Sequence, residues 1–121
     1  MMRRRRSARL LGAVALALVA CTGDPGDRPA IWTYLHPAIV APGCATSSCH
    51  NARVETAGVA LDDAEAYDAL IERRFVVPGD PASALMALLE GDERGRMPPD
   101  APLPAADIEL IRAWIEAGAP R

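Results

Sequence analysis

Cys44, Cys49 and His50 lie within seven residues of one another, in the sequence Cys-Ala-Thr-Ser-Ser-Cys-His. The chain has one further cysteine, Cys21, and its only phenylalanine is Phe75, so it has little aromatic bulk from which to build a core. Small domains with so little core commonly depend on an additional constraint such as a disulfide, a metal or a bound group. The Cys-x4-Cys-His stretch is the part of the sequence that can supply one.

The spacing of this stretch is two residues longer than Cys-x2-Cys-His, the signature of covalent c-type haem attachment. In that signature two thiols add to the vinyl groups of one porphyrin, and the adjacent imidazole takes one axial position on the iron. Cys49 and His50 keep the adjacency, and residues 45–48 are small enough to bulge between the two anchors. Two other interpretations stay open: a Cys44–Cys49 disulfide with His50 on the surface, or a zinc site that uses these three residues and His36.

Residues 1–20 have the features of a bacterial export signal. A basic region with five arginines precedes an apolar run, Leu10–Ala20, that is too short to be a stable transmembrane anchor. The run ends in Leu-Val-Ala-Cys, which resembles a lipobox, and we expect Cys21 to carry lipid that holds the protein at a membrane. The other interpretation is simple signal cleavage with Cys21 unmodified. The protein is expected to be exported and to face the periplasm or the cell exterior.

Removal of this signal leaves 101 residues, which suits one small domain. We expect a polar tether at residues 21–29 and a folded domain at residues 30–121. The eight arginines that remain, with no lysine, are outnumbered by sixteen acidic residues. This balance argues against a nucleic-acid partner and favours docking to a partner with a basic face. No convergent pair of carboxylates and no Ser-His-Asp arrangement is visible, so we expect neither an enzyme nor a small-molecule substrate.

The apolar periodicity predicts an all-α domain of about four short helices with long loops between them. Pro37 interrupts the first helix and Pro42-Gly43 ends it, whereas Asp62 or Asp63 caps the second. Asp80, as the N-cap residue before Pro81, starts the third. The last helix carries an apolar stripe and ends before a glycine. The four expected ranges are 30–41, 64–73, 81–90 and 104–117.

Met97 lies in a long polar loop, residues 91–103, in the sequence Arg-Met-Pro-Pro. Long loops in compact domains are often functional, and the prolines stiffen the backbone beside the thioether. Met97 is therefore the candidate for the second axial iron ligand, because a His/Met pair is a frequent ligation of c-type haem. A methionine that covers an apolar patch is the other interpretation. Met86 lies in an apolar helix face and is expected in the core, and His36 is an alternative distal ligand.

These motifs together resemble small c-type cytochrome domains, in particular the planctomycete-type and related bacterial lipoprotein cytochromes. After Cys49-His50 come Val-Pro-Gly-Asp-Pro-Ala-Ser at residues 77–83, then Met97-Pro98-Pro99, and then Trp-Ile-Glu-Ala-Gly-Ala at residues 114–119. The resemblance covers about residues 31–120, and the x4 gap is the one departure from its pattern. It implies a cytochrome c fold around one haem, covalent haem c with its iron as cofactor, and electron transfer with redox protein partners. It also implies thioether bonds at Cys44 and Cys49 and iron ligands His50 and Met97.

Overall fold

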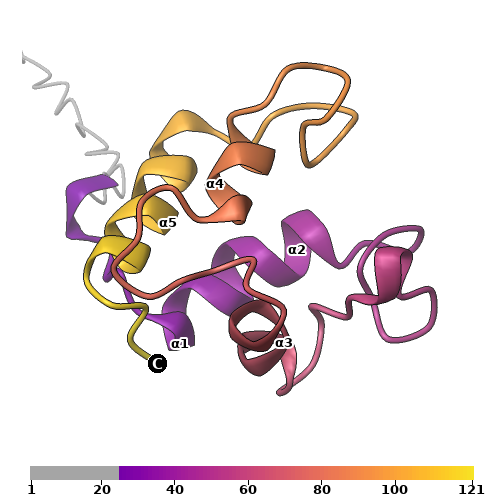
Figure 1. Cartoon of the computed structure of the whole chain (residues 1–121), viewed down its shortest axis with the longest axis horizontal. Coiled ribbons are helices and arrows are strands. Elements are labelled where there is room, and N and C mark those ends of the chain that lie inside the picture. The colour runs from indigo at the N-terminus through magenta and orange to yellow at the C-terminus, as the bar shows by residue number, and fades with distance from the viewer. Residues whose placement is uncertain (1–24) are drawn as a thin grey trace, which may run out of the picture.

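The computed structural model describes residues 25–121, and Figure 1 shows their arrangement. The predicted signal segment and Cys21 lie outside these residues. The described part contains helices and loops and no strand, which confirms the expected all-α class. None of its helices is long and apolar enough to cross a membrane. The helices are α1 (Trp32–Leu35), the π-helical segment η2 (His36–Val40), α2 (Ala41–Cys44), α3 (Ala66–Glu72), α4 (Ala84–Leu89) and α5 (Ala105–Glu116), with short 3₁₀ turns η1 (Pro25–Asp27) and η3 (Thr56–Gly58).

The first helical stretch is longer than predicted, because α1, η2 and α2 follow one another without a break up to Cys44. Pro37 lacks a backbone N–H, and the hydrogen-bond ladder widens around it, so that the Ala41 N–H donates to the His36 carbonyl five residues earlier. Pro42 was expected to end the helix. It instead falls in the first turn of α2, directly after the π-helical segment, and the helical stretch continues to Cys44.

α3 and α4 both begin later than predicted. Before α3, the Asp63 carboxylate accepts a hydrogen bond from the Glu65 N–H at 3.2 Å, so it caps the turn that precedes the helix. Before α4, Asp80 accepts from the Ala82 N–H at 2.9 Å through its carboxylate, and from the Ser83 N–H at 3.1 Å through its carbonyl. Asp80 therefore closes a separate turn, and α4 begins after Ser83.

α5 follows its prediction closely and supplies the centre of the core. Ile111, Trp114 and Ile115 are buried on one face, as the apolar stripe predicts. The helix ends with the Ala119 N–H bonded to the Trp114 carbonyl at 2.9 Å, and Gly118 takes a φ of 92° that favours glycine. α5 packs against α4, and Met86 of α4 is buried in the core, as expected.

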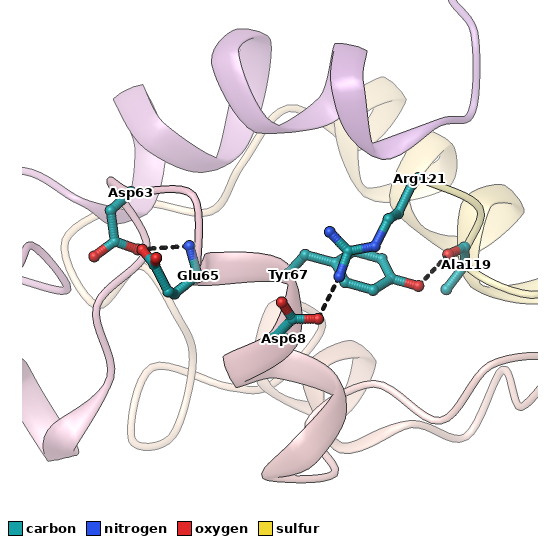
Figure 2. A network of polar contacts seen from close by, with 6 residues as sticks. All are labelled: Asp63, Glu65, Tyr67, Asp68, Ala119 and Arg121. Carbon is teal, nitrogen blue, oxygen red and sulfur yellow. Dashed lines mark hydrogen bonds and ion pairs between the residues drawn. The ribbon is translucent and has the colours of Figure 1, made fainter.

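The C-terminal residues join α1, α3 and α5. The Pro120 carbonyl accepts from the Trp32 N–H at 3.0 Å and from the Trp114 indole N–H at 2.8 Å. Figure 2 shows the neighbouring contacts: the Tyr67 hydroxyl donates to the Ala119 carbonyl at 2.8 Å, and Arg121 pairs with Asp68. The two tryptophan rings lie 5.5 Å apart, and both are buried. They belong to this aromatic core.

Candidate functional site

A cavity of about 390 Å³ opens between α2, α3, α4 and the loops that follow α2 and α4. Its volume lies within the range of small-molecule and cofactor sites. Cys44, Cys49, His50 and Met97 all line it, so the structure brings together the four site residues predicted from the sequence. Figure 1 shows the loops that follow α2 and α4 extending on the same side of the molecule. The rest of the wall is mainly apolar and includes Val59, Leu61, Leu70, Phe75, Leu85, Leu88 and Leu89.

The backbone between the two cysteines forms a compact turn. α2 ends at Cys44, and the His50 N–H returns to the Cys44 carbonyl at 3.0 Å. Within this closure the Cys49 N–H donates to the Thr46 carbonyl at 3.0 Å. Thr46, Ser47 and Ser48 are exposed. The two residues in excess of the usual spacing are thus accommodated in a turn, while both cysteines still line the cavity.

Both cysteines are half-buried free thiols. Burial, with a smaller contribution from Cys49 nearby, raises the pKa of Cys44 from 9.0 to about 11. Cys44 is therefore protonated at neutral pH. Because the thiolate is the nucleophilic form, this burial slows reactions of Cys44 with small electrophiles.

The backbone of the segment at residues 59–61 holds both the ring and the carbonyl of His50. The His50 Nδ1 lies 3.3 Å from the Val59 carbonyl oxygen, and because a carbonyl only accepts, Nδ1 carries the proton. In the neutral ring Nε2 then keeps its lone pair, which is the atom that a metal would bind. The Leu61 N–H also donates to the His50 carbonyl at 2.6 Å. Such outer contacts fix the tautomer and orientation of histidine ligands.

Met97 is attached to α4 through its backbone. Its N–H donates to the Leu88 carbonyl at 2.9 Å, and the Arg96 Nε lies 3.5 Å from the Pro98 carbonyl oxygen. The Met97–Pro98 peptide bond is cis. The Met97 side chain is 38% exposed and lines the cavity together with Pro98 and Pro99. A thioether on a cavity wall that also carries an imidazole fits the donor set of a His/Met haem site.

His36 does not line the cavity, so the structure gives no support to its role as a distal ligand. Its Nε2 is engaged with the Leu61 carbonyl at 2.9 Å. Within residues 25–121 no group of three or more His, Cys, Asp and Glu side chains is arranged to hold a metal ion, so the zinc interpretation has no support there either. Trp32 and Trp114 also lie away from the cavity.

Sequence reasoning missed the segment Val59–Leu61, which was expected only to wrap as a loop. Its two apolar side chains are buried and line the cavity, and its backbone holds His50. The spacing of Val59 and Leu61 was a weak signal, because alternating apolar residues indicate a segment with one buried face. Their backbone contacts have no signal in the sequence.

Part of the chain matches a known protein family. Residues 47–101, just under half of the chain, match the family described as Planctomycete cytochrome C. The match contains Cys49, His50 and Met97 and begins after Cys44. Searches of curated proteins and of solved structures gave no significant match. The family is one of electron carriers that hold haem c, and it is not a family of enzymes.

Proposed function

Residues 47–101 belong to the planctomycete cytochrome C family, and on this premise we propose that the chain is a membrane-anchored carrier of a single c-type haem. In this proposal Cys44 and Cys49 form the two thioether bonds, and His50 and Met97 are the axial ligands of the iron. Bound haem supplies an iron that accepts and releases one electron. The residues of the chain hold the haem, exclude water and set its reduction potential.

One observation carries the proposal: Cys44, Cys49, His50 and Met97 line the same apolar cavity. Met97 is 47 residues away from His50 in the sequence and comes from a different loop, so local sequence does not force the two together. Two thiols, an imidazole and a thioether are the groups that a covalent His/Met haem site requires. The apolar wall suits the apolar porphyrin plane. It also gives the iron a surrounding of low dielectric, which favours the less charged ferrous state.

The charge of the chain supports docking to a basic-faced redox partner. Sixteen acidic residues against eight arginines leave the chain after residue 20 strongly negative, which steers oppositely charged proteins toward it. Lipid on Cys21 would keep the protein at a membrane that faces the periplasm or the cell exterior, with residues 21–29 as the tether. Arg28, near the end of this tether, pairs with Asp107 in the first turn of α5.

The axial ligation is tested with the full chain, produced together with a haem-attachment system. We expect Met97→Leu, which keeps the size of the side chain but removes the sulfur, to abolish the weak red absorption band of a methionine-ligated ferric haem. It should also lower the reduction potential, because methionine ligation raises that potential. Arg94→Gln, in the same loop but outside the cavity lining, is the control and should leave both unchanged. An unchanged band and potential in Met97→Leu would exclude Met97 as a ligand.

A further inference from the structure

His36 lies outside the cavity but contacts the segment that forms one of its walls. It belongs to the π-helical segment η2, and its ring lies 5.1 Å from the ring of Trp32, with 35° between the planes. Its Nε2 is 2.9 Å from the Leu61 carbonyl oxygen. Because that oxygen only accepts, Nε2 carries the proton and donates. The Trp32 stack and this hydrogen bond together fix the ring.

The segment that His36 contacts is also the one that holds His50. The Leu61 N–H donates to the His50 carbonyl at 2.6 Å, and the Val59 carbonyl accepts from the His50 Nδ1–H at 3.3 Å. The side chains of Val59 and Leu61 are buried in the core. The ring of His36 and the ring of His50 are thus each hydrogen-bonded to a carbonyl of the same short backbone segment, residues 59–61.

We propose that His36 is a positioning residue for His50: by donating to the Leu61 carbonyl it fixes the backbone that orients the His50 ring. The inference rests on the proposed role of His50 as an iron ligand. Without the His36 donor, the segment at residues 59–61 loses this hydrogen bond to the first helical stretch. The hydrogen bond from the His50 Nδ1–H to the Val59 carbonyl then weakens. Because of this the imidazole becomes a weaker electron donor to the iron, and its ring plane turns.

The test compares haem-loaded full-length variants by two measurements. Proton NMR of the ferric form gives the hyperfine-shifted haem methyl signals, whose pattern depends on the plane of the axial imidazole, and voltammetry gives the reduction potential. His36→Phe keeps an aromatic ring against Trp32 but has no donor. His36→Gln keeps an N–H donor of similar reach. His36→Leu is a second donor-free variant, for use where Phe does not fit.

Tyr67→Phe is the matched control, because it removes a side-chain to backbone hydrogen bond of the same kind, from the Tyr67 hydroxyl to the Ala119 carbonyl, that does not involve residues 59–61. We expect the donor-free His36 variants to change the methyl pattern and raise the potential. His36→Gln should stay close to the unmodified protein. Tyr67→Phe should lower stability without changing either signal.

Three results would overturn the inference, and they separate it from the proposed function. An unmodified chain that takes up no haem would refute the proposed function and, with it, this inference. A haem-loaded set in which His36→Phe or His36→Leu leaves both signals unchanged would refute the inference alone. So would a set in which Tyr67→Phe shifts the signals as much as the His36 variants do, because the effect would then be one of general stability.

Discussion

Ser83→Ala should destabilise the protein strongly, because Ser83 is 2% exposed and its hydroxyl serves several backbone groups. The Oγ accepts from the Val77 N–H at 2.9 Å and lies 2.7 Å from the Asp80 carbonyl, to which it donates. Alanine removes both hydrogen bonds, so that the Val77 N–H and the Asp80 carbonyl each lose the Ser83 hydroxyl as a partner. A net loss of about 1 kcal/mol for each bond, plus desolvation of the partly buried Val77 N–H that is left without its partner, gives a cost of about 2–3 kcal/mol.

The site depends on this turn, because it connects Phe75 with Leu85, which both line the cavity, and the Leu85 N–H donates to the Phe75 carbonyl at 2.8 Å. Guanidinium unfolding, followed by tryptophan fluorescence, measures the free energy. A loss of about 2–3 kcal/mol corresponds to a drop in Tm of roughly 8–24 °C for a domain of this size. Ser47→Ala is the control, because Ser47 is exposed. A Ser83→Ala protein within about 0.5 kcal/mol of this control would refute the reasoning.

Three further predictions concern the cavity and the anchor. Leu70→Ala, at a 3% exposed position on the cavity wall, should reduce the free energy of unfolding by about 2–5 kcal/mol; a loss below about 1 kcal/mol in denaturant titration would contradict the packing. In a haem-free chain with Cys21→Ser and Cys49→Ser, the rate of Cys44 alkylation should rise with pH around a midpoint well above 9.0, because burial raises the pKa of Cys44. A midpoint at 9.0 would mean that the thiol is exposed. Cys21→Ser should abolish fatty-acid labelling and release the protein from the membrane fraction, whereas a labelled variant would place the lipid elsewhere.

The parts of the fold that follow from local signals were predictable. α5 has a regular apolar stripe, a start beside Pro104 and a stop beside Gly118, and the structure places it within one residue of its prediction at either end. The meeting of the candidate site residues was also predictable as a group, because Cys-x4-Cys-His and Met97-Pro98-Pro99 appear in the order that small c-type cytochromes use.

The parts that depend on tertiary contacts were not predictable. The first helical stretch continues past Pro37 and Pro42, because a π-helical segment at residues 36–40 accommodates the backbone N–H that proline lacks. The apolar pattern of the sequence does not indicate this change from α-helical to π-helical hydrogen bonding. Asp80 has the sequence of an N-cap, yet the buried hydroxyl of Ser83 holds residues 80–83 in a separate turn. The carbonyl of Val59 that orients His50 has no signature, because every residue has a carbonyl.

Covalent attachment of one haem through Cys44 and Cys49 is decided by the intact mass of the purified chain together with its pyridine haemochrome spectrum. The chain is produced with its own signal beside a haem-attachment system. We expect a c-type spectrum with both thioethers formed and the added mass of one haem. A colourless protein two protons lighter than the reduced chain would contradict this expectation and would identify Cys44 and Cys49 as a disulfide instead.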